Sequence, residues 1–165
     1  MQIYRAAVSA PLVTTASNQP FFALFGSNSG RILRVRRIQV SIPVLGTTSF
    51  KQINLVKYQS QPTGGDLANL LKVPIDSESP SSSAALCAVY QSAPTPGNQV
   101  GVIAARRLLY IDASASASDT VDVVDLDFRD FGGIVLRDEN EGVCLQHSDV
   151  TASISVTIDA EWSEE

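Results

Sequence analysis

The sequence predicts an all-β protein: an antiparallel two-sheet sandwich with a jelly-roll-like arrangement. Apolar and polar residues alternate with period two along many short segments, and clusters of turn-forming residues separate these segments. No segment carries an apolar 3.6-residue period long enough for a real helix. Roughly nine or ten strands without helices to cover them must bury their apolar sides against a second sheet. An immunoglobulin-type sandwich is disfavoured, because the single tryptophan follows both cysteines in the chain.

The clearest strand is expected at residues 151–162, "TASISVTIDAEW". One face is apolar and consists of Ala152, Ile154, Val156, Ile158, Ala160 and Trp162. The alternate positions carry Thr, Ser, Asp and Glu, so the pattern predicts one buried face and one solvated face along a single strand.

The other strands are expected in nine further segments: 2–10, 21–26, 31–43, 50–59, 84–92, 100–112, 120–128, 133–137 and 142–147. Gly, Pro, Asn and Ser cluster in the turns between them, at 26–30, 61–66, 76–83, 92–98, 131–133 and 139–142. Residues 76–86 have the composition of a single helical turn capped by Asp76 or Ser79. The low-complexity segment 112–119, "DASASASD", is typical of a solvated loop.

An arginine-rich strand at residues 31–42, "RILRVRRIQVSI", carries a change of phase. Leu33 and Val35 are apolar at odd positions, whereas Ile38 and the apolar residues after it are at even positions. Because side-chain direction in a strand has period two, the change predicts an inserted residue or a corner at Arg36 or Arg37.

A second arginine pair, Arg106 and Arg107, lies inside the apolar segment 100–112. The segment 120–128 shows its own phase change and an acidic side with Asp122, Asp125 and Asp127. We therefore expect the arginines to pair with carboxylates across the sheet or across a subunit boundary. A nucleic-acid surface is disfavoured, because exposed aromatic residues are not interleaved with the arginines and the sequence pI is about 4.8.

Length and composition favour one globular domain. The 165 residues carry a formal net charge of -5, with 44% hydrophobic and 18% charged residues. We expect residues 1–19 to form an N-terminal strand or an extended arm, and residues 20–165 a single β-sandwich. No apolar run is long enough to cross a bilayer, and we expect no secretory signal and no membrane partner. Cys87 and Cys144 lie in apolar segments and are expected to be buried free thiols.

Catalytic and metal-binding patterns are not evident in the sequence. The single histidine, His147, ends a strand-like segment and is expected at the surface. Residues 137–142, "RDENEG", resemble the start of a calcium loop but lack its distal glutamate, so a hairpin turn is the better interpretation. The acidic group Asp122, Asp125, Asp127 and Asp130 is interpreted as a solvated face. We expect no enzymatic activity, no cofactor and no bound metal.

Several segments together resemble small β-sandwich virion proteins of tailed bacteriophages, the capsid cement or decoration proteins. The similar phrases, in chain order, are "PFFALFG", "GRILRVRRIQVSI", "LVKYQSQPTGG", "VPIDSESPSSSAALCAVYQSAP", "VGVIAARRL", "VLRDENEGVCLQ" and "AEWSEE", and they span roughly residues 20 to 163. Arg34, Arg36 and Arg37 match the basic strand of that group, and Trp162 matches its closing strand. The serine-rich "PSSSAAL" departs from an alanine-rich run in the group.

This resemblance implies a non-enzymatic virion structural protein that binds the outer surface of the head and stabilises contacts between major capsid protein subunits. It implies the major capsid protein and further copies of the chain, as a homotrimer, as partners. The residues expected at the interface are Arg34, Arg36, Arg37, Arg106, Arg107, Phe21 and Phe22. The alternative is a receptor- or carbohydrate-binding head of a tail fibre, or another tail or neck component, because such sandwiches also serve as lectins.

Overall fold

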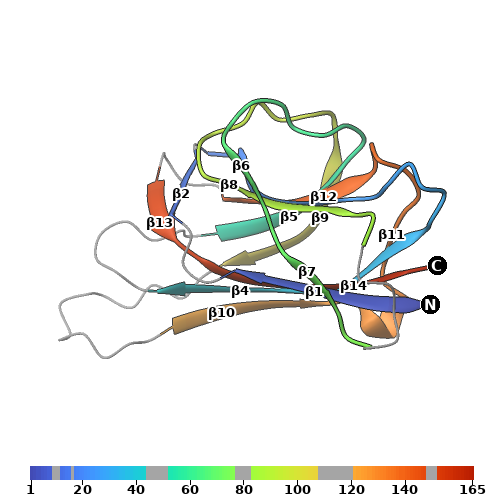
Figure 1. Ribbon diagram of the computed structural model, residues 1–165. Helices are drawn as coiled ribbons and strands as arrows, with labels where there is room; N and C mark the ends of the chain where they lie inside the picture. Colours follow the sequence, from blue (N-terminus) through green and yellow to red (C-terminus); the bar gives the residue numbers. More distant parts are fainter. Residues whose placement is uncertain (9–11, 16, 44–51, 77–82, 108–120, 148–151) are drawn as a thin grey trace.

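Two six-stranded antiparallel sheets face each other in the computed structural model (Figure 1). The structure describes residues 1–8, 12–15, 17–43, 52–76, 83–107, 121–147 and 152–165. In chain order the strands are β1 (Gln2–Val8), β2 (Leu12–Thr15), β3 (Pro20–Phe25), β4 (Leu33–Pro43), β5 (Gln52–Tyr58), β6 (Leu67–Asn69), β7 (Lys72–Pro74), β8 (Leu86–Tyr90), β9 (Gln99–Arg107), β10 (Val121–Asp127), β11 (Ile134–Leu136), β12 (Gly142–His147), β13 (Ala152–Ser155) and β14 (Thr157–Glu164). A 3-10 turn, η1 (Arg129–Phe131), joins β10 to β11.

The first sheet has the strand order β10-β4-β14-β1-β7, with β11 also pairing β4. The second sheet has the order β6-β8-β3-β12-β5-β9, and a separate pair joins β13 to β2. The prediction of an all-β antiparallel two-sheet sandwich is thus confirmed, and the narrower expectation of a jelly roll stays a prediction. Within residues 2–8, the N-terminal segment is the strand β1, paired on both sides inside its own chain rather than extended as a free arm.

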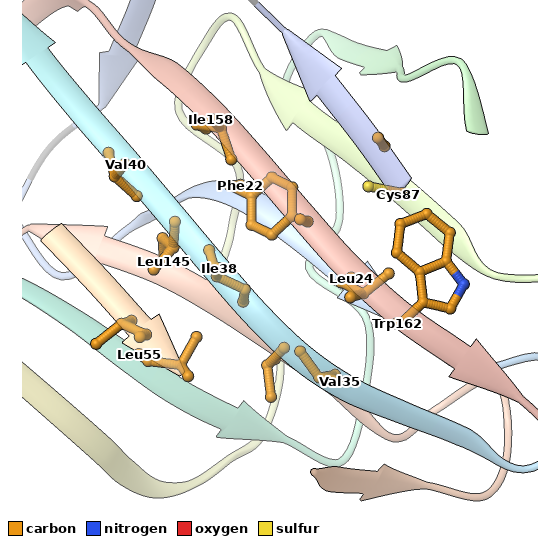
Figure 2. Close-up of a cluster of buried hydrophobic side chains, with 14 of the residues drawn as sticks. Phe22, Leu24, Val35, Ile38, Val40, Leu55, Cys87, Leu145, Ile158 and Trp162 are labelled. Atoms are coloured by element: carbon orange, nitrogen blue, oxygen red, sulfur yellow. The ribbon is translucent and has the colours of Figure 1, made fainter. Parts of the chain in front are cut away.

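The core lies between the two sheets and draws alternate residues from both. Figure 2 shows Val35, Ile38 and Val40 of the first sheet facing Leu24 and Leu145 of the second. Trp162 is fully buried at one end of this core and stacks on Tyr4, with ring centroids 6.1 Å apart. Burial of large apolar side chains at roughly 1.5–3 kcal/mol each is the main source of stability for such a fold.

The outer face of the second sheet is also covered. A smaller apolar cluster there contains Phe25, Val56, Tyr58, Tyr90 and Cys144, and the segments after β5 and β8 arch over this side of the sheet (Figure 1). A bridge between Thr63 and Thr95 joins the two segments, with N–H···O distances of 3.0 and 2.8 Å. As a result β3 and β12 are buried at every position.

The C-terminal alternation is confirmed in part. Val156, Ile158, Ala160 and Trp162 are buried, whereas Thr157 is exposed. The expectation of one continuous strand was wrong, because residues 152–155 pair with β2 and residues 157–164 pair with β1 and β4. A strand that changes partners satisfies its backbone groups in two sheets, which a periodic pattern does not reveal.

The closing residues of β14 form a buried polar network. Glu164 is almost fully buried and accepts hydrogen bonds from the Ser83 hydroxyl and from Trp162 Nε1, the latter at 3.3 Å. Arg31 Nη1 lies 3.0 Å from Glu164 Oε2 and supplies the opposite charge. A buried carboxylate is tolerated only with such partners, so this network anchors the end of β14.

One turn prediction needs correction. Residues 137–142 connect β11 in the first sheet to β12 in the second, so they form a crossover between sheets and not a hairpin. Asp138 Oδ1 accepts from the backbone N–H groups of Asn140 at 2.8 Å and Glu141 at 3.0 Å, and these two hydrogen bonds close the turn. The helical turn expected at 76–86 falls largely outside the described residues, as does the loop 112–119.

Candidate functional site

The outer face of the first sheet carries a row of alternating charges. Arg5 on β1 lies opposite Glu161 on β14, and Glu161 lies opposite Arg37 on β4. Asp127 on β10 also lies opposite Arg37, on the side of β4 away from β14. Opposite charges at directly facing positions of neighbouring strands stabilise this pairing relative to pairings shifted by one residue. The row therefore helps to align four strands, and it makes this face polar rather than a second packing face.

Ion pairs within the chain engage these arginines. Arg37 binds Asp125 through Nε at 2.9 Å and Nη2 at 2.5 Å, and Arg36 Nε lies 2.9 Å from Glu161 Oε1. Arg5 makes a similar forked contact with Asp159, with Nε 2.7 Å from Oδ1. The expectation that the arginines pair with carboxylates across the sheet is confirmed for these residues. Because the pairs are partly exposed, solvent screening leaves each of them only a small contribution to stability.

The same pairs shift the pKa values of their members. The hydrogen bond from Arg37 lowers the pKa of Asp125, and the hydrogen bond from the Arg129 side chain lowers the pKa of Asp127 to about 2. The hydrogen bond to Asp125 raises the pKa of Arg37. All of these groups are therefore charged across the physiological range, and the face keeps both signs of charge at neutral pH.

A β-bulge lies at Arg36, as the change of phase predicted. The register of the β4–β14 ladder shifts so that Glu161 faces Arg37 and Trp162 faces Val35, leaving Arg36 as the extra residue. Leu33, Val35, Ile38 and Val40 are consequently all buried on the inner side. The carbonyl of Arg36 accepts from the Phe128 N–H at 2.8 Å, so the bulge also docks the segment that leads into η1.

The second expected phase change, within residues 120–128, does not produce a bulge. β10 pairs with β4 in an unbroken register from Val121 to Asp127. Val123 is simply an exposed apolar residue on the outer side with Asp125 and Asp127, while Val124 and Leu126 are buried. Exposed apolar residues are common in proteins, and one of them next to a buried apolar residue looks, in the sequence, like a change of phase in the apolar–polar alternation.

A hollow of about 260 Å³ opens beside the bulge. Its charged lining consists of Arg34, Arg36, Arg129 and Glu165, and Gly132 and Gly133 complete the side formed by the turn after η1. Arg34 Nε lies 3.3 Å from Glu165 Oε2. The sheet pairing of β4 with β10 and β11 brings these residues together although Arg129 is far from Arg34 in sequence.

The expected interface residues do not form one surface. Arg34, Arg36 and Arg37 share the first sheet, whereas Arg106 is exposed on β9 at the edge of the second sheet and donates to the carbonyl of its neighbour Ala105 at 3.2 Å. Arg107 belongs to the same strand and lies opposite Gln52 in the β5–β9 ladder, and its side chain is not among those that the structure describes.

Phe21 and Phe22 are fully buried in the core, which corrects their expected place at an interface. They lie on β3, which has both sides covered, so neither ring is offered to a partner. His147 is likewise fully buried, with its ring 6.4 Å from that of Phe21, although the sequence suggested a surface position. His147 lies opposite Ile53 of β5 and on the same side of β12 as Leu145, so this end of the strand faces the main core between the two sheets.

Phe131 was not singled out from the sequence. It sits on η1 with 85% of its surface exposed, next to the two glycines that line the hollow. Gly132 and Gly133 have φ angles of 75° and 81°, a region that other residues avoid, so the turn that presents Phe131 is specified by "FGG". The sequence feature that could have identified Phe131 is an aromatic residue directly before two turn-forming glycines.

Other exposed apolar residues lie on the sheet edges. Leu71, Val73 and Ile75 line the edge at β7, and Val100, Val102 and Ile103 line the edge at β9. β9 has two register shifts against β5, which leave Val100 and Ile103 as extra residues. Bulges of this kind hinder pairing with another strand, so the β9 edge is blunted.

Metal-ligand and membrane features were also sought among the described residues. No group of three His, Cys, Asp or Glu side chains there is placed to hold a metal ion. Of the acidic residues considered as ligands, Asp125 and Asp127 bind arginines. Asp130 is exposed, and the side chain of Asp122 is not among those that the structure describes. No helix in this part of the chain has the length and apolar character needed to cross a bilayer.

Both cysteines are buried free thiols, as expected. Cys87 faces the main core and Cys144 the smaller outer cluster. Burial raises the pKa of Cys87 to about 12 and raises that of Cys144 well above its usual range. Neither thiol is therefore activated as a nucleophile at neutral pH.

Comparison with protein-family models, with curated proteins and with solved structures finds no match to this chain.

Proposed function

We propose that the protein is a bacteriophage capsid cement protein that binds the outer surface of the head and stabilises contacts between major capsid protein subunits. The proposal rests first on the ordered sequence phrases described above. The observation that carries it on the structural side is the partly exposed arginine-bearing surface of β4, with Arg34, Arg36 and Arg37, together with the exposed Phe131 on η1. Arginine and aromatic residues are enriched at protein interfaces and among the residues that dominate binding energy.

The connectivity supports the jelly-roll part of this proposal. In the first sheet four strands follow the order β10-β4-β14-β1, and in the second four follow the order β9-β5-β12-β3. We read these eight strands as two Greek keys, with β6, β7 and β8 inserted between β5 and β9. Such a sandwich leaves short edges and loops to contact a lattice while its core stays intact.

The proposed mechanism is preferential binding to one state of the shell. A protein that binds only the expanded lattice stabilises that lattice by mass action, and many copies at symmetry-related positions multiply a modest contact energy. A homotrimer is the proposed form, because closed rotational symmetry suits threefold positions between capsomers. Analytical ultracentrifugation of the free protein tests this assembly state, and a monomer at micromolar concentration contradicts it.

The decisive experiment compares occupancy on expanded and unexpanded heads. We expect saturable binding to expanded heads only, and a higher temperature of head disruption when the protein is bound. Replacing Arg36 and Arg37 together with Ala should reduce occupancy. The fold should survive, because solvent screening makes each of these partly exposed ion pairs a minor contributor to stability.

Arg5→Ala is the matched control, since Arg5 belongs to the same charged row and pairs with Asp159, but lies on β1 away from the hollow. Equal occupancy of the double variant and the control removes Arg36 and Arg37 from the contact. Failure of the unmodified protein to bind either form of head contradicts the cement function itself.

The alternative is a carbohydrate- or receptor-binding head on a tail component, and one observation favours it. A second hollow, of about 430 Å³, is lined by polar side chains that include Ser27, Asn28, Gln61 and Asn69. Amide and hydroxyl groups suit hydrogen bonding to sugar hydroxyls. Binding to host surface polysaccharide that Asn69→Ala abolishes, without binding to heads, assigns the protein to this alternative.

A further inference from the structure

We propose that the hollow between β4 and η1 receives a carboxylate side chain of a protein partner, and that Phe131 inserts into an apolar pocket beside that carboxylate. The proposal deepens the cement function and rests on it for the identity of the partner, the major capsid protein. It names a contact surface, Phe131 with Arg34, Arg36 and Arg129, that differs from the expected set.

The arginines of the hollow keep hydrogen-bonding capacity. Arg36 and Arg34 each contact a carboxylate through Nε, and Arg129 contacts Asp127 through Nε and Nη2. A guanidinium group has five N–H donors in a planar fork. Within the described contacts, both Nη groups of Arg34 and Arg36 and the Nη1 group of Arg129 are left to bind a further acceptor.

The charge of the lining selects the occupant. Three guanidinium groups and one carboxylate, Glu165, line the hollow, so its wall favours an anion. Guanidinium groups bind carboxylates through paired N–H···O contacts. The carboxylates that pair with Arg36 and Arg129 come from the neighbouring strands and are not part of the lining, so Glu165 is the one carboxylate among the lining residues.

Phe131 supplies the apolar half of the contact. Single exposed apolar residues are ordinary on protein surfaces. Phe131 differs because it lies on η1 between Arg129 and the two positive-φ glycines, three residues that line the hollow, within a turn tied to β4 through the Phe128 N–H and the Arg36 carbonyl. A partner therefore meets an aromatic anchor and an arginine-bearing hollow on the same turn.

The hollow is tested alone by nuclear magnetic resonance of the arginine Nε–Hε groups during a titration with sodium acetate. We expect the signals of Arg34 and Arg36, which contact their carboxylates through Nε alone, to shift at least about threefold more than those of Arg5, Arg37 and Arg129, whose carboxylates engage them in forked contacts. Uniform shifts of all five overturn the anion site. A markedly stronger response to sodium phosphate than to acetate overturns the choice of a protein carboxylate.

The partner contact is tested with Phe131→Ser, and Leu71→Ser is the control. Leu71 is 80% exposed and lies next to β7, at the edge of the first sheet opposite β10, the strand that leads into η1. In co-sedimentation with expanded heads, Phe131→Ser and Arg129→Ala should each weaken binding at least about tenfold, and Leu71→Ser less than about twofold. Equal effects of Phe131→Ser and Leu71→Ser overturn the anchor. If the unmodified protein does not bind heads, the cement function fails, while the acetate titration still decides the hollow.

Discussion

Deletion of Arg36 is the sharpest test of how β4 is built. Val35 pairs with Trp162, and Arg37 pairs with Glu161, although Trp162 and Glu161 are adjacent on β14. Removing the extra residue between Val35 and Arg37 makes both strands equal in length across this point. Both of these pairs survive, and Leu33, Val35, Ile38 and Val40 keep their inward direction because alternation becomes regular.

The energetic effect of this deletion comes from two interactions that Arg36 makes. The Phe128 N–H no longer has the Arg36 carbonyl as its acceptor, which costs about 0.5–1.5 kcal/mol, and the ion pair with Glu161 contributes about 0–1 kcal/mol. We expect a decrease of roughly 1–2 kcal/mol in the free energy of unfolding and a fall of about 2–8 °C in melting temperature. Urea denaturation followed by the fluorescence of the buried Trp162 measures it.

Deletion of Gln39 is the matched control, because the ladder is regular there. With Gln39 absent, Ile38 and Val40 become neighbours and cannot both face the core. Expelling one such side chain costs at least about 2–5 kcal/mol, and the remainder of the strand is displaced as well. If deletion of Arg36 destabilises the protein as much as deletion of Gln39, the bulge does not absorb the phase change and the reasoning is refuted.

Four further predictions follow from single sites. Gly142→Ala should destabilise the fold by about 1–3 kcal/mol, seen as a lower urea midpoint, since an added Cβ meets the Phe25 ring; an unchanged midpoint contradicts that packing. Cys87 and Cys144 should react with a thiol reagent at pH 8 only on unfolding, because burial raises their pKa values; fast labelling of the native protein would show otherwise. Asp127 has a folded pKa of about 2, below its ordinary value, so its ionised form adds stability above about pH 4 that disappears as the pH falls towards 2. The urea midpoints of the wild type and Asp127→Asn should therefore converge on acidification. A difference between the two midpoints that stays constant with pH contradicts this dependence. A chelator should leave the melting temperature unchanged, and a clear drop would revive a cation site among the aspartates.

The patterns that the sequence predicted well are local ones. Side chains in a strand alternate with period two, so the inward faces of β4 and β14 could be read from residues such as Val35, Ile38 and Ile158. The phase change within β4 was visible through the same rule, which predicted an inserted residue or a corner at Arg36 or Arg37. The ion pairs across the sheet could be expected in kind, since arginines and carboxylates occupy the exposed positions of neighbouring strands.

The candidate site was predicted only in part. Arg34 and Arg36 were identified from their own strand, but their neighbour Arg129 and the projecting Phe131 come from the β10–β11 connection. Which connection lies beside β4 depends on the strand order of the sheet, and a single strand's pattern carries no information about its neighbours. For the same reason, sequence reasoning placed Arg106 with the other arginines, although β9 belongs to the other sheet.

The sequence by itself determined the all-β class, the inward faces of β4 and β14 and the phase change at Arg36 or Arg37, because each depends on period-two geometry within single segments. Only the tertiary structure decided that a second layer covers the outer face of β3 and β12. That layer buries Phe25, Tyr58 and Cys144 and leaves no solvated side on these strands. It depends on segments distant in the chain, joined at Thr63 and Thr95, and burial by distant segments leaves no periodic signal in the residues it covers.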